Sequence, residues 1–427
     1  MKEIKISDTN EIVYTFTTPT NLPVYMWVNN QKKNVFMTLN VRYGSKNIHF
    51  KCNKQEYSVP TGTAHYLEHL KFHLKDKDAS DIIFDLGGDT NAYTSINETS
   101  FEVYANKNIY EACKVLLDFV QDNFFTKSMV NNERGIILEE ANSYKDNPKT
   151  EFYQKINNAL FNNLSLKHPV IGYERDINKI ELDDIALVHE YFYRPENMFM
   201  VITGSFDPEK MKKTILDNEK DRTYKNIGKI EKIKEVETKE LREKKIVIYN
   251  KNCANTSAKY IIKTLESDYK GYTKEEILCA LKALFYANFG TSSDFYEYIM
   301  QNQLATYFGR SISYDDGVIC LTLTVESEEY EKVFKLVDEK INDMKIDKSE
   351  LNRYINVLKS SSIMKYDNIY SAAASFIGSL IDDDTIDSNR LGITKKLTIK
   401  KIMDIYSKVD ISNKLIAALK PEKKKQK

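Results

Sequence analysis

The chain of 427 residues carries 62 basic and 62 acidic residues, so its formal net charge at pH 7 is zero. This length is enough for two or three domains that each bury a sizeable core. The balanced charge gives no electrostatic reason to expect binding to nucleic acid or to an anionic membrane surface, and we expect neither.

The five cysteines are odd in number and contain no Cys-x-x-Cys pair, which predicts free thiols in a reducing compartment. The first residues form no apolar signal core, and no run approaches the roughly 18 apolar residues of a membrane span. Together these features predict a cytoplasmic protein.

Short runs rich in branched and aromatic residues predict strands at 12–17, 24–28, 35–43 and 198–204. Stretches with helical periodicity lie between these runs, for example at 109–124. The fold class that we expect is therefore α+β, with mixed sheets backed by helices.

The first chemically informative segment is 63–72, where His65, Glu68 and His69 are spaced three and four residues apart. On a helix such residues are neighbours, so both imidazoles can face one metal ion with the carboxylate beside them. The order His-x-x-Glu-His is the inverted zincin motif. In a chain with six histidines, chance would produce this motif roughly 0.01 times. The alternative is a helix with ordinary surface histidines.

His73 continues the histidine stripe of this helix. Three histidines along one straight helix span about 12 Å, so they cannot all reach one ion. We therefore interpret His73 as a surface residue at the helix end.

A hydrolytic zinc site takes three protein ligands and leaves a fourth position for water, so a third ligand is needed. The segment 131–144 predicts a helix on which Glu133 and Glu140, seven residues apart, share one face. Glu139 is rotated by about 100° from Glu140 and is the less suitable ligand. The alternative is an acidic helix whose carboxylates face solvent.

Between these two helices, 90–95 and 99–105 are rich in Thr, Tyr, Phe and Val and are separated by a short turn, which predicts a hairpin. If the first strand lies at a sheet edge, a peptide can add to it through main-chain hydrogen bonds. The alternative is an ordinary hairpin with an asparagine in a turn.

The motifs resemble the pitrilysin family of inverzincin zinc peptidases, which includes insulin-degrading enzyme and the mitochondrial processing peptidase. The resemblance covers residues 10–210, continues weakly towards the C-terminus, and is strongest to short bacterial members. The matching blocks are His65-x-x-Glu68-His69, Gly87-Gly88, Asn91-Ala92-Tyr93-Thr94, Glu98-Thr99, Glu133-Arg-x-x-Ile-x-x-Glu140 and Tyr193-Arg-Pro-Glu-Asn-Met198.

The resemblance implies one zinc ion per chain, held by His65, His69 and Glu140. It implies catalytic roles for Glu68, the general base, and for Glu133, which would orient a ligating histidine. Substrate would bind along the edge strand, where Asn91 would bond a carbonyl of the peptide. The substrate-binding residues that we expect are Asn91, Ala92, Tyr93, Thr94 and Tyr307.

Two similar halves are expected, because a predicted hairpin at 305–325 is again followed by a predicted helix at 328–344. The resemblance implies two homologous mixed-sheet-plus-helix domains, processing-peptidase-like (LuxS and mitochondrial-processing-peptidase type), that form a clamshell. We expect an N-terminal catalytic zinc-binding domain at 1–220, a charged linker at 221–245, a homologous C-terminal domain at 246–420 and a basic tail at 421–427.

The second half departs from the self-sufficient members of the family. Those members use an Arg and a Tyr there to grip the substrate. In this chain Met300 stands at the place of the Arg, Tyr307 is a candidate for the Tyr, and Arg310 is nearby but out of register. Family members without this pair commonly work with a homologous zinc-less subunit, so we predict a heterodimer with such a partner.

The function that we expect is that of a zinc-dependent metalloendopeptidase acting on peptides or unfolded precursor segments in the cytoplasm. The alternative is a non-catalytic scaffold or core-type subunit of a larger complex. Degenerate members of the family usually lose a metal ligand or the general base. In this chain the three expected ligands and the expected base are all present: His65, His69, Glu140 and Glu68. The substrate and its cleavage specificity stay open.

Overall fold

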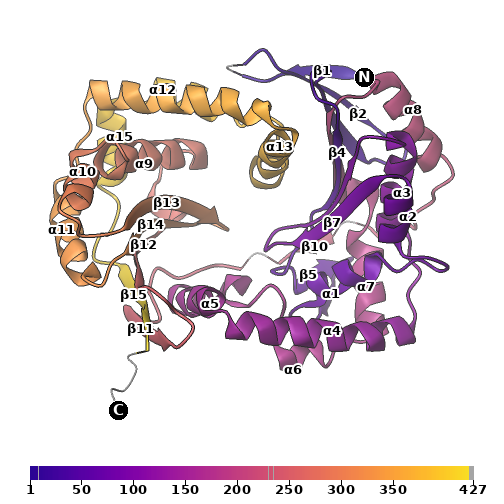
Figure 1. Ribbon diagram of the computed structural model, residues 1–427, viewed down its shortest axis with the longest axis horizontal. Helices are drawn as coiled ribbons and strands as arrows, with labels where there is room; N and C mark the ends of the chain where they lie inside the picture. The colour runs from indigo at the N-terminus through magenta and orange to yellow at the C-terminus, as the bar shows by residue number, and fades with distance from the viewer. Residues whose placement is uncertain (8, 229, 234, 423–427) are drawn as a thin grey trace. The chain divides into compact units, whose positions relative to one another are not determined.

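The computed structural model describes residues 1–7, 9–228, 230–233 and 235–422 (Figure 1). The chain forms two compact units, and each of them contains segments from distant parts of the sequence. The N-terminal unit consists of Met1–Asn142, His168–Lys234 and Ser362–Ser388, and the C-terminal unit consists of Ser143–Lys167, Glu235–Ser361 and Asn389–Lys427. Each unit has its own main sheet and its own hydrophobic core.

A seven-stranded mixed sheet forms the centre of the N-terminal unit. Its strand order is β1 (Lys2–Lys5), β2 (Ile12–Thr17), β3 (Pro23–Val28), β9 (Met198–Gly204), β4 (Val35–Val41), β8 (Thr99–Ala105) and β7 (Gly88–Thr94). The β3–β9 pair is parallel and the others are antiparallel. A smaller sheet has the order β10 (Ile230–Lys232), β5 (His49–Cys52) and β6 (Gln55–Ser58).

Helices cover both faces of the large sheet, because successive side chains of a strand point to opposite sides. On one face, Met37 and Leu39 of β4 belong to the same core as α3 (Ile109–Gln121) and α8 (Pro208–Glu219). On the other face, Phe36 packs with α13 (Ile369–Asp383). Figure 1 shows α3 and α13 on opposite sides of the sheet. This double cover explains why β4 and β9 are buried along their whole length.

The other helices of the N-terminal unit surround the two sheets. They are α1 (Thr63–Lys71), α2 (Ala79–Asp85), α6 (Glu174–Ile177), α7 (Leu182–Phe192) and most of α4 (Lys127–Asp146), with short 3₁₀ turns at Pro195–Asn197 and Lys365–Asp367. Within the described ranges, no helix of either unit combines the length and the apolar character that crossing a bilayer requires.

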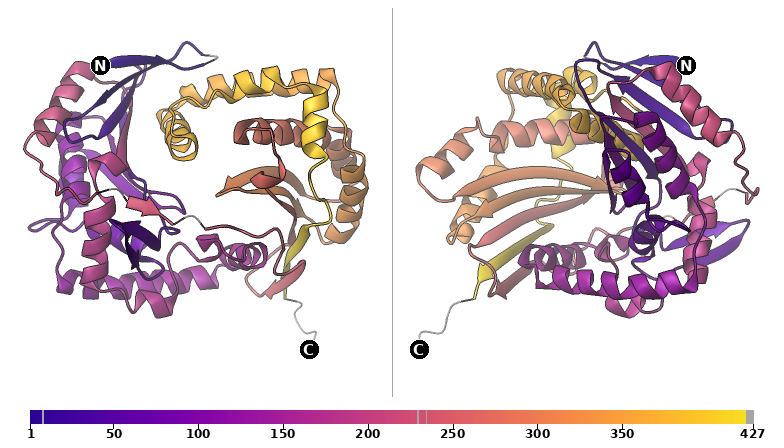
Figure 2. Two further views of the ribbon diagram at one scale, coloured as in Figure 1. Left: turned by 180° about the vertical axis from the view of Figure 1, so that it is seen from behind. Right: turned by 45° about the vertical axis from the view of Figure 1, so that its right-hand side comes forward.

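The C-terminal unit is built on a five-stranded sheet. Its strand order is β11 (Lys245–Asn250), β15 (Lys414–Pro421), β12 (Ser257–Leu265), β14 (Val318–Glu326) and β13 (Tyr307–Asp315). Figure 2 shows α9 along one face of this sheet. The helices are α5 (Pro148–Leu160), α9 (Lys274–Phe289), α10 (Asp294–Gln301), α11 (Tyr330–Asn342), most of α12 (Lys348–Met364), α14 (Arg390–Lys396) and α15 (Ile399–Tyr406), with 3₁₀ turns at Ser165–Lys167 and Glu266–Asp268.

The predicted fold class, α+β with two mixed-sheet-plus-helix domains, is confirmed. The predicted strands at 12–17, 24–28 and 198–204 agree with β2, β3 and β9 to within one residue, whereas 35–43 extends past the end of β4. The expected internal repeat is present as well. An edge hairpin followed by a helix occurs as β7, β8 and α3 in one unit and as β13, β14 and α11 in the other.

The compact units differ from the expected division at 1–220 and 246–420. Residues 143–167 belong to the C-terminal unit and residues 362–388 to the N-terminal unit, where α13 covers the sheet. The expected linker at 221–245 is also partly structured, because β10 pairs with β5. In the expected basic tail at 421–427, Pro421 ends β15, and 423–427 lie outside the described residues.

Glu237 shows why the segment 221–245 is more than an exposed connection. Its side chain is 1% exposed and accepts hydrogen bonds from the backbone N–H groups of 162–164, with N···O distances of 2.9–3.0 Å. Lys263 Nζ, which is fully buried, lies 3.1 Å from Glu237 Oε1 and also donates to the carbonyl of Leu160 at 2.6 Å. Burial alone would raise the pKa of Glu237, but these hydrogen bonds lower it to about 2.

Replacing Lys263 by Met is expected to lower the free energy of unfolding by about 3–5 kcal/mol, because it leaves the Glu237 carboxylate buried without its counter-charge. Urea denaturation followed by circular dichroism measures this loss. Lys259→Met on the same strand is the control. The Lys259 side chain donates to Thr324 at 3.0 Å and is only partly buried, so about 1 kcal/mol or less is expected. Equal losses of unfolding free energy in both variants would contradict the role of Lys263 as the counter-charge of Glu237.

Candidate metal centre

The candidate metal centre is built on α1, whose position is set by its buried face. The helix begins after Gly62, whose backbone φ of +91° and close approach to the carbonyl of Ile171 leave no room for a side chain. Leu67 and Leu70 are fully buried in the core of the N-terminal unit. Tyr66 is also fully buried, and its hydroxyl donates to the backbone carbonyl of Val130 on α4. The hydrogen bond ties α1 to the helix that carries Glu133 and Glu140.

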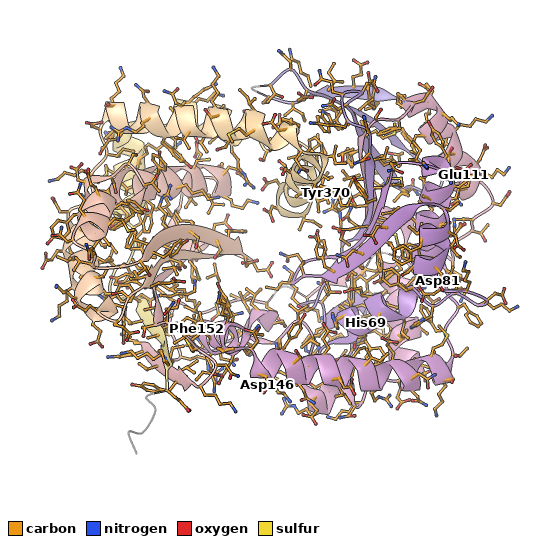
Figure 3. The ribbon with its side chains drawn as sticks, viewed as in Figure 1. His69, Asp81, Glu111, Asp146, Phe152 and Tyr370 are labelled. Carbon is orange, nitrogen blue, oxygen red and sulfur yellow. The ribbon has the colours of Figure 1, made fainter. Side chains whose placement is uncertain are left out.

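Three donor side chains from these two helices meet at one point. Nitrogen atoms of His65 and His69 and a carboxylate oxygen of Glu140 all lie within 4.8 Å of one another. Glu140 Oε2 is 3.7 Å from His65 Nε2 and 3.4 Å from His69 Nε2. Figure 3 shows the side chains of this region, with His69 labelled. Glu139, the neighbouring carboxylate, is exposed to solvent instead.

The surroundings shift the pKa values of the two imidazoles in opposite directions. Burial, together with the nearby His69, lowers the pKa of His65 to about 3, so its ring is neutral and has a lone pair to offer. Burial opposes the charged form of His69 too, but its hydrogen bond to Glu133 and the surrounding carboxylates raise its pKa. The same hydrogen bond directs His69 Nε2 towards Glu140.

Two imidazoles and one carboxylate are the donor set of catalytic zinc sites, which bind the ion at about 2.0–2.2 Å and keep one position open. Donor atoms of a tetrahedral ion at this radius are about 3.4 Å apart. The two histidine-to-Glu140 separations, 3.7 and 3.4 Å, are close to this value. The residues present therefore fit a zinc ion.

Glu133 is buried next to the donor cluster, with its side chain 6% exposed. Its Oε1 lies 2.8 Å from His69 Nδ1, and its Oε2 lies 3.0 Å from His73 Nε2. Burial alone would raise the pKa of Glu133, but the two histidine hydrogen bonds lower it to about 2. The carboxylate is thus held ionised and points one oxygen at a candidate ligand.

His73 lies at the surface just beyond the end of α1, as expected, with its side chain 42% exposed, but it also has two specific partners. The helix ends at Lys71, so His73 is not part of a straight stripe, and its imidazole instead contacts Glu133 on one side and Asp78 on the other. The sequence signal that was available is the third histidine at a four-residue spacing, followed by the helix-capping Asp78.

Glu68 lies on the same helix and is buried, with 7% of its surface exposed. Burial raises the pKa of its carboxyl, while the hydroxyl of Thr94 opposes this shift by donating to Glu68 Oε2 at 2.5 Å. Thr94 is the last residue of β7. The candidate base is therefore in direct contact with the strand on which substrate is expected to bind.

The strand β7 forms an edge of the large sheet, as the substrate-binding hypothesis requires. Asn91 lies in the middle of this strand, opposite Glu102 of β8, and its side chain is exposed. Ala92 packs against the core, and the hydroxyl of Tyr93 donates to Glu98 at 3.1 Å. The free side of β7 is available for main-chain pairing.

The candidate residues of the C-terminal unit occupy three different environments. Tyr307 begins the edge strand β13 and is 51% exposed. Met300 lies on α10 and packs partly against the core of that unit. The guanidinium of Arg310 lies 4.8 Å from the ring centre of Tyr286, in a cation–π contact.

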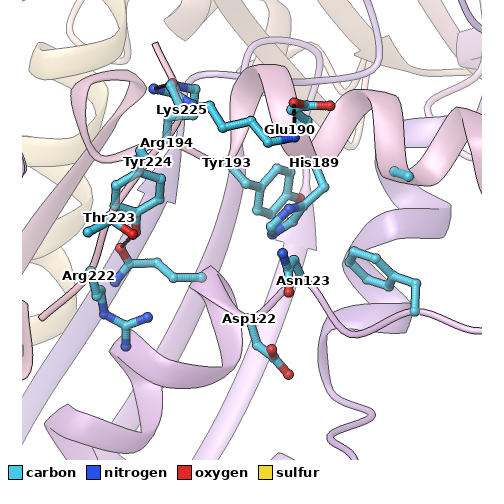
Figure 4. A pocket seen from close by; sticks show the side chains of 13 residues that line it. Asp122, Asn123, His189, Glu190, Tyr193, Arg194, Arg222, Thr223, Tyr224 and Lys225 are labelled. Carbon is cyan, nitrogen blue, oxygen red and sulfur yellow. Dashed lines mark hydrogen bonds and ion pairs between the residues drawn. The ribbon is translucent and has the colours of Figure 1, made fainter. Parts of the chain in front are cut away.

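A separate cavity of about 520 Å³ lies in the N-terminal unit (Figure 4). Its three cationic lining residues are each paired: Arg194 with Glu196, Arg222 with Asp118 and Lys225 with Glu190. His189 also lines it, 3.4 Å from the buried Lys71 Nζ. Lys71 is rotated by about 200° from His69 on α1, so this cavity is not part of the donor cluster.

Comparison with known proteins identifies the family. Residues 28–174 match the family model described as insulinase (peptidase family M16), and residues 179–358 match the model described as peptidase M16 inactive domain. A Bacillus subtilis protein named as the uncharacterized zinc protease YmfH is 29% identical over 322 residues, which are 74% of this chain and 73% of that protein. The human mitochondrial-processing peptidase subunit beta is 24% identical over 164 residues, which are 37% of this chain and 34% of that protein.

Solved structures of peptidases in this family have the same fold as this chain. An M16-like peptidase from Alicyclobacillus acidocaldarius has a TM-score of 0.88 at 19% identity and covers 98% of this chain and 100% of that chain. Pitrilysin has a TM-score of 0.76 at 15% identity and covers all of this chain, which spans 47% of the pitrilysin chain.

The two-unit α+β fold and the His-x-x-Glu-His helix define the class of inverzincin-like chains. This chain belongs to the insulinase family, peptidase family M16.

Replacing Glu140 by Gln is expected to remove most of the bound zinc, because it takes away the one anionic donor of the cluster. Glu139→Gln removes a carboxylate one residue away on an exposed side of the helix, and it should leave zinc content unchanged. Atomic-absorption measurement of zinc per chain after dialysis distinguishes the two. Loss of zinc in the Glu139 variant with retention in the Glu140 variant would reverse the ligand assignment.

Proposed function

We propose that this chain is a zinc-dependent endopeptidase that cleaves peptides or unfolded segments. The observation that carries the proposal is the meeting of three metal donors, His65, His69 and Glu140, beside a buried carboxylate that contacts an edge strand. Membership of a family whose relatives include named zinc proteases supports it. The proposed donors hold one zinc ion per chain.

The chemistry follows from these contacts. Zinc, when bound, would supply the positive charge that acidifies a water molecule and polarises a scissile carbonyl. Glu68, next to the ligands, accepts the proton of the attacking water and passes it to the leaving amine. Thr94 fixes one oxygen of Glu68, so the other is free for this proton transfer. Glu133 keeps the proton of His69 on Nδ1, which leaves Nε2 for the metal.

The edge strand β7 supports an extended substrate. A peptide that pairs with its free side uses main-chain hydrogen bonds, so the strand selects unfolded backbone rather than a particular sequence. We propose that Asn91 contributes a side-chain hydrogen bond, because it is exposed on this strand. A folded protein would not offer its backbone in this way. A cytoplasmic location is part of the proposal, and the five free cysteines support it.

We further propose that the active form is a heterodimer with a homologous partner that lacks zinc. Met300 occupies the place of an expected substrate-gripping Arg, and Arg310 is engaged with Tyr286 in its own unit. The matched model for residues 179–358 is described as an inactive domain, and one relative is named as a peptidase subunit. In this proposal the partner supplies an Arg and a Tyr, and Tyr307 remains a candidate contact.

The alternative is a non-catalytic subunit. One structural neighbour is a chain of Complex III2 from Candida albicans, with a TM-score of 0.73 at 13% identity. A scaffold role makes no use of a buried general base beside three metal donors, so we favour the peptidase.

Glu68→Gln is expected to abolish cleavage while zinc content stays near one ion per chain, since the amide keeps the shape and cannot take up a proton. Hydrolysis of a quenched extended peptide pool, measured with the assembled protein, reports the loss. A general base contributes about 10²–10⁴-fold to rate, so residual activity should fall by at least that much. Undiminished cleavage by this variant would exclude the assigned base, and a zinc-bound protein that cleaves nothing in any assembly would favour the scaffold.

The lone chain is expected to turn over this peptide pool at least about 10²–10³-fold more slowly than the native assembly, because it lacks both the Arg and the Tyr of the partner and the loss of one such donor alone usually costs this much. Purification of the chain from its own cells tests this, with mass spectrometry to identify a homologous partner. Equal turnover by the lone chain, unchanged in Met300→Ala and Arg310→Ala variants, would contradict the need for a partner.

A further inference from the structure

Beyond the donor cluster, a chain of four side chains leads away from the metal position. Asp78 Oδ2 lies 3.2 Å from His73 Nδ1, His73 Nε2 lies 3.0 Å from Glu133 Oε2, and Glu133 Oε1 lies 2.8 Å from His69 Nδ1. His69 Nε2 then faces Glu140. We propose that His73 is a positioning residue that sets the orientation and tautomer of the metal ligand His69 through Glu133. This inference rests on the proposed zinc site.

The far end of the chain is anchored by the backbone. Asp78 caps α2, because its Oδ1 accepts from the backbone N–H of Ser80 at 2.9 Å, and this leaves Oδ2 for His73. His73 and Asp78 also form an isolated antiparallel β-bridge. The N–H of Ala79 donates to the carbonyl of Phe72 at 2.8 Å. The position of His73 is thus fixed twice: by the β-bridge of its backbone and by the contact of its Nδ1 with Asp78.

His73 is the group that completes the pairing of Glu133. The Glu133 carboxylate is buried, and both of its oxygens are used by histidines. His73 lies between the carboxylates of Asp78 and Glu133, and its Nε2 is placed to donate a hydrogen bond to Glu133 Oε2.

Loss of the His73 donor has a definite consequence. A buried carboxylate oxygen without its hydrogen-bond donor is costly, so the Glu133 side chain would turn away from His69 to find another partner. This turn removes the acceptor that keeps the His69 proton on Nδ1. The Nε2 lone pair would then be presented less often to the metal, and affinity for zinc would fall. Partners of this kind typically contribute about 10–100-fold.

The test is zinc affinity, measured by competition with a chromogenic chelator on the full chain. His73→Phe keeps the ring shape without hydrogen bonds and is expected to weaken zinc binding by about 10-fold. His73→Gln places an amide N–H near the position of Nε2 and is expected to recover most of this loss. His49→Phe is the matched control. His49 lies in β5, where its Nδ1 is 3.0 Å from the hydroxyl of Ser58 and it is not one of the four side chains of the chain described above. The His49→Phe variant should bind zinc as the wild type does.

The outcomes separate this inference from the proposed function. Wild-type affinity in His73→Phe, with a normal melting temperature of the metal-free chain, would overturn the role of His73 and leave the zinc site intact. Equal weakening in the Phe and Gln variants would also overturn it, because a merely structural role is not rescued by a donor. Absence of zinc binding by the wild type would overturn the proposed function and this inference together.

Discussion

The structure of the site depends on one constraint, which is that donors from two separate helices must meet at distances of about 3.4 Å. The hydrogen bond from Tyr66 to the backbone of Val130 meets this constraint, because it fixes α1 against α4 from the buried side. Shifting either helix by one residue would rotate its donors by about 100°. The exposed position of Glu139 shows the result of such a rotation on α4.

Three buried acidic side chains, Glu68, Glu133 and Glu237, are each stabilised by different neighbours. Glu133 is paired with histidines, so it stays ionised and orients them. Glu68 is bonded by a neutral hydroxyl and is shifted towards the protonated form by burial, which is the balance that a group exchanging protons needs. Glu237 is bound by backbone N–H groups and Lys263, and it serves the packing of the C-terminal unit. The same residue type therefore serves three purposes, which its surroundings decide.

Much of the fold and of the candidate site could be predicted from local pattern. The histidines at a four-residue spacing, the two glutamates seven residues apart and the hairpin with β-rich composition each depend on short-range geometry, and the structure contains all three. Contacts between residues far apart in sequence could not be read in this way. The capping of α2 by Asp78 is local, but the contact of His73 with Glu133 requires the packing of α1 on α4.

Charge patterning indicated where the two compact units divide, at 234/235, but not the contacts that the segment makes. The segment 221–245 is rich in Lys and Glu and resembles a solvated linker, yet the backbone of 162–164 binds Glu237 inside the C-terminal unit. Composition likewise could not indicate that α13 crosses to the sheet of the N-terminal unit, because its apolar residues would suit either sheet. Such assignments depend on shape complementarity rather than on periodicity.

The central claim is that His65, His69 and Glu140 hold a zinc ion with an open position, and X-ray absorption spectroscopy at the zinc edge of the purified chain tests it most directly. The expected spectrum contains two imidazole nitrogens together with carboxylate and water oxygens at about 2.0–2.2 Å, with no sulfur ligand. A spectrum with sulfur neighbours, or with four protein ligands that leave no place for water, would contradict it.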